Sequence, residues 1–196
     1  MKNVITISRS YGAGGGTIGH YVAERLGLEY LDKAIILATA NEAQVSVESA
    51  LKLDEMVPIN FGFAQSLFDF YNKPLNERLF DAQSDVIKLF GERGNCVIVG
   101  RNANSILKNF DNCLHVFIDG SVEFRKERML QKEMYKGVSE EKMIEVINTV
   151  DKRRAKYCEY YTNTEFGNAK NYDVCLDSSR IGIEKCVDII CQLAKG

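Results

Sequence analysis

A glycine-rich turn near the N-terminus constrains this chain more than any other feature. It follows an apolar, β-branched run at residues 4–8 and precedes an amphipathic helical pattern. A strand that ends in such a turn directs several backbone N–H groups at one point, and the following helix adds the positive end of its dipole. The segment therefore predicts a cradle for phosphate groups. Its residues are Gly12, Ala13, Gly14, Gly15, Gly16 and Thr17.

The turn departs from the usual phosphate-binding loop, which reads G-x-x-x-x-G-K-[ST]. Gly15 stands where the lysine belongs, and Arg9 stands where the first glycine belongs. The predicted cradle therefore lacks its usual cation. Arg9 directly precedes the turn, so it is a better candidate to replace that cation than Lys33.

The composition favours one globular domain. The chain has 196 residues, of which 45% are apolar and 27% charged, close to the average for folded proteins. Its formal net charge is only −2, so a long polyanion finds no general attraction, and we expect no nucleic-acid partner. A small anion must instead be bound by a local group of cations.

A membrane partner and a cysteine-based zinc site are also disfavoured. No apolar run approaches the roughly 20 residues that a membrane-spanning helix needs, and the N-terminus has a strand pattern in place of a signal-peptide pattern. We therefore expect a cytoplasmic protein without a membrane partner. The six cysteines include no C-x-x-C pair, so the sequence predicts buried free thiols, Cys175 in a strand among them, and no metal-ligating residues.

Five apolar or β-branched runs alternate with helical patterns. They lie at residues 4–8, 29–32, 96–100, 114–119 and 172–177. Continuous apolar runs suit strands that are covered on both faces, so the sequence predicts a three-layer, doubly wound α/β fold with a parallel five-stranded sheet. Ligands in such folds bind beyond the carboxyl ends of the strands. The charged residues expected at those ends are Arg9, Asp32, Arg101 and Asp119.

Residues 33–95 are too many for a simple crossover and are predicted to form a mostly helical insertion. Its last helix is expected to begin near Pro74, which suits a first helical position. The apolar stripe of this helix consists of Leu79, Val86 and Phe90. Gln83 falls on the stripe, where an amide is either satisfied in the interior or faces a ligand. Upstream aromatic residues are more typical of core packing than of a base-stacking platform; they are Phe61, Phe63, Phe68, Phe70 and Tyr71.

Local positive charge is concentrated in residues 123–162. A solvated helix face is the default interpretation, but Arg154 lies on the apolar stripe of a helix that Ser139 is predicted to cap. A guanidinium at a buried position needs a partner, and phosphate matches its planar fork. Asp151 edges the same face, so the pair could bind substrate. The cations of the segment are Arg125, Lys126, Arg128, Lys132, Lys136, Lys152, Arg153, Arg154 and Lys156.

The order and spacing of these motifs resemble the cytidylate kinase-like family over nearly the whole chain. The turn resembles the G-A-G-K-G-T of nucleoside monophosphate kinases with lysine changed to glycine, and residues 100–102 resemble the G-R-D of cytidylate kinases. Residues 151–154 are similar to the D-x-x-R of their lid. The resemblance implies a single P-loop kinase-like domain over residues 1–196, with 33–95 as a helical acceptor-binding insertion and 123–162 as a lid-like segment.

The resemblance implies transfer of the γ-phosphoryl group of ATP to CMP or a related pyrimidine monophosphate, with Mg²⁺. Such transfer depends on positioning and on neutralising phosphoryl charge. The glycine-rich turn would hold the donor phosphates, and Asp32 would order the hydrated metal ion. The residues with an implied catalytic role are Arg9, Asp32, Arg125, Arg128 and Arg154. The residues expected to contact substrate are Gln83, Arg101, Asp151 and Arg154.

Other functions remain open at this point. Residues 14–19 match the dinucleotide-binding pattern G-x-G-x-x-G, with Asp32 at a suitable distance, which is compatible with an oxidoreductase. The missing lysine is compatible with a nucleotide-binding module without catalysis. A kinase of a non-nucleotide small molecule would share the donor site and differ in the insertion. The acceptor is open as well, because Asn102 and Ala38 replace an aspartate and an arginine of the family.

Overall fold

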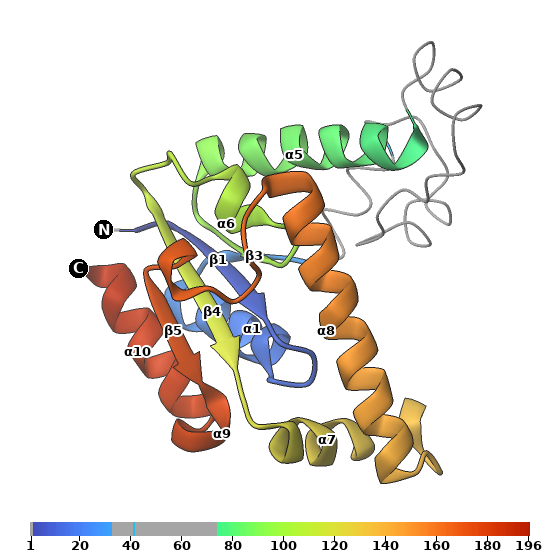
Figure 1. Ribbon diagram of the computed structural model, residues 1–196. Coiled ribbons are helices and arrows are strands. Elements are labelled where there is room, and N and C mark those ends of the chain that lie inside the picture. Colours follow the sequence, from blue (N-terminus) through green and yellow to red (C-terminus); the bar gives the residue numbers. More distant parts are fainter. Residues whose placement is uncertain (1, 33–40, 42–73) are drawn as a thin grey trace.

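The computed structural model describes residues 2–32, 41 and 74–196 of the chain. Its centre is a five-stranded parallel sheet with the strand order β2-β3-β1-β4-β5. The strands are β1 (Val4–Arg9), β2 (Glu29–Leu31), β3 (Cys96–Val99), β4 (Cys113–Asp119) and β5 (Val174–Asp177). All five predicted strands are confirmed, and Figure 1 shows β3, β1, β4 and β5 side by side in this order.

The strand order decides one of the alternatives left open by the sequence. β1 pairs with β3 and β4, while β2 lies at the edge of the sheet beyond β3. The dinucleotide-binding fold has the order 3-2-1-4-5-6, in which the second strand lies beside the first. The oxidoreductase interpretation is therefore wrong for this chain.

Helices cover both faces of the sheet, which gives the predicted three layers. α1 (Gly15–Leu26) and α10 (Ile183–Lys195) pack on one face, and α5 (Leu75–Arg93) and α6 (Ala103–Ile106) on the other. The core of the first face includes Ile5, Val97, Val116, Ile18, Val22 and Ile190. The core of the second includes Val4, Cys96, Ile98, Val86, Ile87 and Leu107. Alternate residues of β1, β3 and β4 thus enter opposite cores, which is why these central strands are largely apolar.

A pair of helices extends beyond the carboxyl ends of the strands. α7 (Val122–Leu130) leads through a short 3₁₀ turn, η1 (Glu133–Tyr135), into the long helix α8 (Glu140–Thr162). Met129, Met143 and Ile147 form a small core between them. The Ser139 hydroxyl accepts from the Lys142 N–H at 3.3 Å, which confirms the predicted cap.

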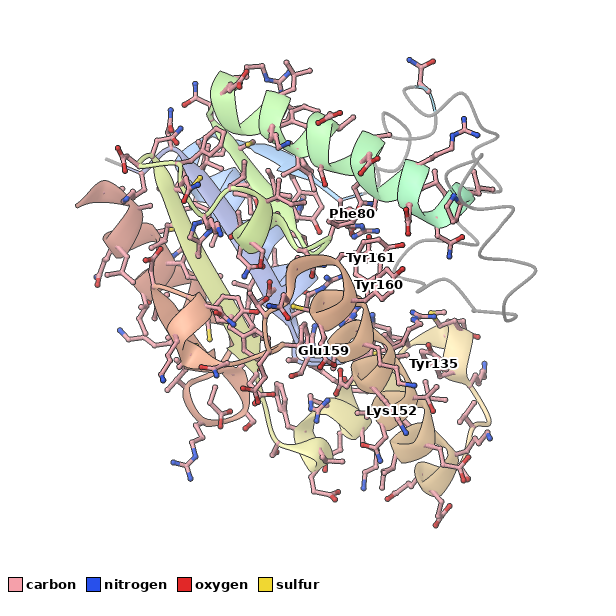
Figure 2. All side chains as sticks on the ribbon, turned by 45° about the horizontal axis from the view of Figure 1, so that its top comes forward. Phe80, Tyr135, Lys152, Glu159, Tyr160 and Tyr161 are labelled. Carbon is pink, nitrogen blue, oxygen red and sulfur yellow. The ribbon has the colours of Figure 1, made fainter. Side chains whose placement is uncertain are left out.

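The C-terminal end of α8 returns to the sheet and packs against α5. The rings of Phe80 and Tyr161 stack there with centroids 4.2 Å apart, and Figure 2 shows them side by side. A segment containing the 3₁₀ turn η2 (Ala169–Asn171) then leads into β5, which is followed by the short helix α9 (Ser178–Ile181). Helix α8 therefore extends from beyond the carboxyl ends of the strands back to α5.

The last helix of the predicted insertion is present. α5 begins at Leu75 directly after Pro74, and Leu79 and Val86 are buried as predicted. Phe90 packs against the core of the second face. The aromatic cluster predicted upstream, from Phe61 to Tyr71, and the positions of Lys33 and Ala38 lie outside the described residues.

The cysteine prediction is confirmed in part. All six are free, and five are buried. Burial raises the pKa of Cys113 and of Cys186 to about 11, so these thiols stay protonated and unreactive at neutral pH. Cys175 is exposed, against prediction, because β5 is an edge strand with one open side. Among the described helices, none combines the length and apolarity that crossing a bilayer would require.

Candidate active site

The glycine-rich turn forms a P-loop between β1 and α1. Gly12 and Gly14 have φ angles of +84° and +88°, a region that side-chain-bearing residues rarely adopt. A Cβ atom at Gly12 would also lie 3.0 Å from the Cβ of Arg125. The loop therefore closes only with glycine at these two positions. It leads directly into α1, whose first N–H groups have no partner within the helix and so suit an anion.

A cavity of about 160 Å³ lies over the P-loop. It is bounded by the loop, by the end of β2 and by the two helices beyond the sheet. The charged residues in its wall are Arg9, Asp32, Arg128, Lys132 and Arg154. Four cations thus face one carboxylate, which favours a ligand with several negative charges. Lys132 was not singled out from the sequence, although it lies in the basic segment.

Arg9 takes an unusual course through this cavity. A Cβ atom at position 15 would lie 2.6 Å from Arg9 Cβ and 2.9 Å from its Cγ. A Cβ atom at position 100 would lie 3.0 Å from the guanidinium carbon of Arg9 and would collide with Nη1. The side chain therefore runs from the end of β1 across the first turn of α1 to the end of β3. Both Gly15 and Gly100 are required by its path.

Arg128 of α7 also reaches the P-loop. Its Nη2 donates to Thr17 Oγ1 at 3.0 Å, and its guanidinium lies 3.5 Å from where a Cβ atom at Gly14 would be. The side chain is half-buried. A second guanidinium is therefore held over the same loop, as expected for a contact to donor phosphates.

Arg125 lies differently from Arg128, although we expected both to face the donor phosphates. Its Nη1 donates to Asp151 Oδ2 at 2.6 Å and to the Tyr11 carbonyl at 3.1 Å, and its Nε donates to the Gly120 carbonyl at 2.8 Å. Asp151 Oδ1 accepts from the Tyr11 N–H at 2.7 Å. Neither Arg125 nor Asp151 lines the P-loop cavity. The pair instead holds the P-loop at Tyr11 from behind.

A crevice of only about 10 Å³, room for one water molecule, adjoins this cavity at the end of β3 and is called the second cavity below. Arg9 and Arg154 line both cavities, and Arg101 lines the second. Arg101 Nη1 donates to Asp32 Oδ1 at 2.7 Å and to the Val99 carbonyl at 3.0 Å. Arg154 Nη1 donates to the Arg9 carbonyl at 3.0 Å, and its guanidinium lies over the Tyr11 ring. Three of the four residues predicted at the strand ends thus meet here; Asp119 lines neither cavity.

The backbone after β3 is strained. Gly100, Arg101 and Asn102 have φ angles of +84°, +56° and +54° in succession. Two consecutive residues with side chains in this region are uncommon and cost free energy that the surroundings must supply. The strain turns the chain sharply between β3 and α6 and directs the Arg101 side chain back toward Asp32.

Gln83 is satisfied in the interior. Its side chain is buried on α5, and its Oε1 accepts from the Tyr157 hydroxyl at 3.1 Å. It lines neither cavity. Of the two interpretations that the sequence left open, the described residues favour the structural one.

The site offers few ligands to a metal ion. Within the described ranges, no group of three or more histidine, cysteine or acidic side chains could hold one. Asp32 and Thr17 both line the P-loop cavity. One carboxylate and one hydroxyl beside a phosphate site fit Mg²⁺, which keeps several of its waters and is commonly bound through one or two carboxylates together with substrate phosphates.

Comparison with known proteins agrees with this arrangement. The profile of the cytidylate kinase-like family matches residues 4–180. A cytidylate kinase from Pyrococcus horikoshii is 26% identical over 181 residues, which cover 91% of this chain and 81% of that protein.

Solved structures show the same fold. An uncharacterized protein from Eubacterium ventriosum superimposes with a TM-score of 0.72 at 22% identity, over 98% of both chains. A shikimate kinase from Bacteroides thetaiotaomicron gives a TM-score of 0.55 at 13% identity, again over 98% of both chains. A sugar kinase from a Janibacter species gives 0.56 at 15%, over 98% of this chain and 94% of that one. The fold is therefore that of P-loop kinases.

Proposed function

Because the chain belongs to the cytidylate kinase-like family, we propose that it transfers the γ-phosphoryl group of ATP to a nucleoside monophosphate, with CMP or a related pyrimidine monophosphate as acceptor. The single observation that carries the proposal is the course of Arg9. Its side chain crosses Gly15, where the lysine of the usual loop would begin, and lines both adjoining cavities. A cation is thus present at the place where the sequence lacks one.

The position of Arg9 suits the charge that phosphoryl transfer develops. The transferred group carries its negative charge between donor and acceptor oxygens, and fixed cations aimed at it lower the barrier. The Arg9 guanidinium extends from the P-loop cavity to the crevice at the end of β3, so it lies between the proposed donor and acceptor phosphates. We assign this role to Arg9.

The remaining cations divide between the two cavities. Arg128 and Lys132 line only the P-loop cavity and are assigned to the donor phosphates. Arg101 lines the second cavity and Arg154 lines both, so these two are assigned to the acceptor phosphate. Arg125 and Asp151 are assigned to holding the P-loop, since both form hydrogen bonds with the Tyr11 backbone.

Mg²⁺ would supply further neutralisation of phosphate oxygens when bound. Asp32 is the residue that would order its water shell, because one carboxylate oxygen is engaged by Arg101 while the side chain also lines the P-loop cavity. Thr17 is placed to assist with its hydroxyl. We further propose that residues 33–95 contain the acceptor-binding insertion and that residues 123–162 act as a lid-like segment.

The test is a coupled phosphotransfer assay with ATP and Mg²⁺ against CMP, dCMP, UMP, AMP and GMP. We expect turnover with a pyrimidine monophosphate, and a loss of about 100-fold or more in Arg9→Ala, the usual effect of removing one transition-state charge contact. Arg93→Ala is the matched control, because Arg93 pairs with Glu29 on the surface, away from both cavities. Its turnover should equal that of the wild type.

Two results would contradict the proposal. Equal turnover in Arg9→Ala and the wild type would remove Arg9 from the transition state. Binding of ATP without turnover of any monophosphate would favour the second candidate, a kinase of a non-nucleotide acceptor. That candidate has one specific observation in its favour, namely the structural likeness to shikimate and sugar kinases. Shikimate and simple sugars therefore belong in the acceptor panel.

A further inference from the structure

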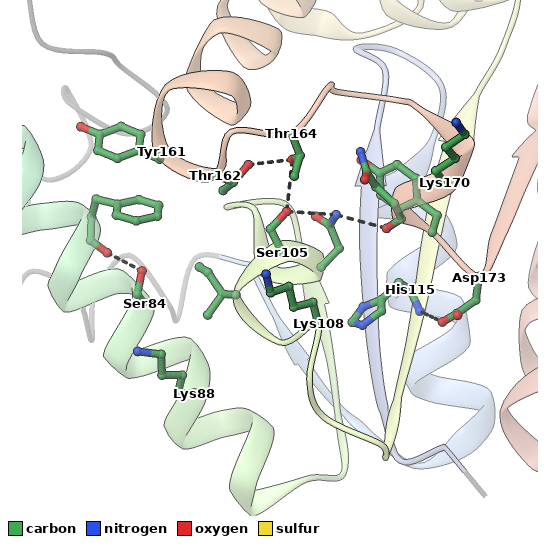
Figure 3. A pocket seen from close by; sticks show the side chains of 15 residues that line it. Ser84, Lys88, Ser105, Lys108, His115, Tyr161, Thr162, Thr164, Lys170 and Asp173 are labelled. Atoms are coloured by element: carbon green, nitrogen blue, oxygen red, sulfur yellow. Dashed lines mark hydrogen bonds between the residues drawn. The ribbon is translucent and has the colours of Figure 1, made fainter.

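Helix α8 is firmly attached at its C-terminal end. Thr164 Oγ1 lies 2.7 Å from Thr162 Oγ1 and 3.5 Å from Ser105 Oγ of α6. Figure 3 shows this chain of hydroxyls in the wall of a cavity of about 530 Å³. The Tyr161 ring lines the same cavity and stacks on Phe80 of α5. These contacts fix one end of α8 to the helices that cover the sheet.

The other end of α8 begins at a turn that has few contacts. Residues 132–137 contain η1 and connect α7 to α8 beyond the carboxyl ends of the strands (Figure 1). Most side chains of the turn are exposed, Met134 to 73%. Tyr135 and Val138 pack on the small core between the two helices. In the part of the chain that the structure describes, the turn makes one hydrogen bond to an element outside α7 and α8, through the Tyr135 hydroxyl.

That hydrogen bond joins the turn to the P-loop. The hydroxyls of Tyr135 and Tyr11 lie 2.5 Å apart. Tyr11 is itself held in place, because its N–H donates to Asp151 and its carbonyl accepts from Arg125. The Arg154 guanidinium lies over the Tyr11 ring, 5.6 Å from its centroid. The turn is therefore tied to a fixed point of the P-loop.

Lys132 extends from the same turn. Its carbonyl accepts from the Tyr135 N–H at 2.9 Å, so the two residues share one backbone turn. Its side chain is exposed and lines the P-loop cavity. Among the described residues, no carboxylate pairs with the Lys132 amine. A long side chain without a partner stays near a phosphate site only if its backbone is held there. The bond between Tyr135 and Tyr11 provides that restraint.

We propose that Tyr11 and Tyr135 are positioning residues, whose paired hydroxyls hold the η1 turn so that Lys132 stays over the P-loop and binds the donor phosphates. The inference rests on the proposed function, because it takes the P-loop cavity to be the ATP site. A cation that is already in place loses less conformational freedom when the ligand binds, so the hydroxyl pair contributes to affinity. Arg128 does not need the turn, since it reaches the loop through its own bond to Thr17.

Isothermal titration calorimetry tests the proposal on the full chain, with Mg²⁺ and the non-hydrolysable ATP analogue AMP-PNP and without an acceptor. Lys132→Ala should bind the analogue about tenfold more weakly, the size expected for a lost hydrogen bond to a charged group. Tyr135→Phe and Tyr11→Phe each remove one hydroxyl of the pair and should each weaken binding at least about threefold. Both variants keep the aromatic ring, so the packing of Tyr135 and the support of Arg154 remain.

The double variant Lys132→Ala/Tyr135→Phe separates positioning from a merely structural role. It should bind the analogue as Lys132→Ala alone does, because the turn then has no cation to position. A merely structural role would lower the melting temperature of Tyr135→Phe and leave its affinity unchanged. Tyr160→Phe is the matched control, since it removes a tyrosine hydroxyl of α8 that bonds to Glu77, away from both cavities of the proposed active site. Its affinity should equal that of the wild type.

The outcomes distinguish this inference from the proposed function. Wild-type affinity in Tyr135→Phe, or additive losses of binding free energy in the double variant, would overturn the inference and leave the proposed function intact. If binding follows the expected pattern but no monophosphate is turned over in the phosphotransfer assay, the proposed function is wrong and the positioning role stands. A wild-type protein that does not bind the analogue at millimolar concentrations would overturn both.

Discussion

The side chain of Arg9 occupies the space that a side chain at position 15 would need. A Cβ atom at Gly15 would lie 2.6 Å from Arg9 Cβ, a distance that real Cβ contacts essentially never show. The neighbouring Gly16 differs, because among the described residues a Cβ atom there would meet only the Tyr30 hydroxyl, at 3.6 Å. Arg9 before the loop therefore requires glycine at position 15, where the usual loop has lysine.

Gly15→Ala should destabilise the protein while Gly16→Ala should not. Both residues lie in the first turn of α1, where alanine is intrinsically better than glycine by about 0.5–1 kcal/mol. At position 15 the clash outweighs this gain, since overpacking costs about 1–3 kcal/mol. Urea denaturation of the two variants measures the difference. Equal free energies of unfolding would show that Arg9 moves aside without cost.

Replacing Arg9 by glycine should restore the stability that Gly15→Lys loses. Gly15→Lys introduces the clash, whereas Arg9→Gly/Gly15→Lys restores both the glycine and the lysine of the usual loop and removes it. We expect a coupling free energy of about 1 kcal/mol or more between the two sites, as for residues in contact. The double variant should also turn over faster than Gly15→Lys alone. Additive effects on stability would contradict a shared space.

The sequence predicted the fold well because the relevant signals are local. The three central strands, β1, β3 and β4, are covered on both faces and so are largely apolar, and the P-loop needs glycine at the two positive φ angles. The sequence also marked Arg9 as the replacement cation. The path of its side chain could not be predicted, because it depends on Gly100. That residue is 91 positions after Arg9 in the sequence and comes close to it only because β1 pairs with β3.

The two arginines of α7 show why the site was harder to predict than the fold. Residues three apart on a helix differ in direction by about 60°. That difference turns Arg125 toward Asp151 of α8 and Arg128 toward Thr17 of the P-loop. The three-residue spacing predicted that both arginines contact the donor phosphates. The difference between them arises because Arg125 has Asp151 of α8 as its partner, and α8 is distant in the sequence.

Asp151→Ala should destabilise the fold strongly. It leaves the buried Arg125 guanidinium without its carboxylate and the Tyr11 N–H without its acceptor. Breaking a buried pair from one side costs about 3–5 kcal/mol. Asp188→Ala is the matched control, because Asp188 pairs with Arg25 at the same 2.6 Å on the surface, where such pairs contribute about 0–1 kcal/mol. Similar losses in both variants, by chemical denaturation, would contradict the structural role.

Arg128→Ala should leave the stability of the fold nearly unchanged and weaken the binding of ATP. The side chain is half-buried, and its one hydrogen bond to the described part of the protein is to the Thr17 hydroxyl, so stability should change by less than about 1 kcal/mol. Loss of a charged contact to the donor should raise the KM for ATP by about tenfold or more. A lower melting temperature with an unchanged KM would show that Arg128 serves the fold and not the donor.

Gln83 and Tyr157 should behave as a coupled pair. Tyr157→Phe leaves the buried Gln83 Oε1 without its donor, which costs about 1–3 kcal/mol. Adding Gln83→Leu should cost less than the two single changes together, because both ends of the bond are then apolar. Gln83→Leu alone should leave the KM for the acceptor unchanged. A raised KM at unchanged stability would restore Gln83 as a substrate contact.

His115 should make stability depend on pH between 7 and 5. Burial on β4 lowers the pKa of the folded-state imidazole below its usual value, Lys2 acts in the same direction, and Asp173 opposes both. The unfolded chain therefore binds more protons as the pH falls through about 6.5, and the free energy of unfolding decreases toward pH 5. A tenfold difference in proton affinity corresponds to about 1.4 kcal/mol. His115→Asn should flatten this dependence in urea denaturation, because asparagine does not titrate. His20→Asn changes the other histidine of the chain, which is exposed, and should retain the pH dependence. If the free energy of unfolding still falls toward pH 5 in His115→Asn, other groups cause the effect.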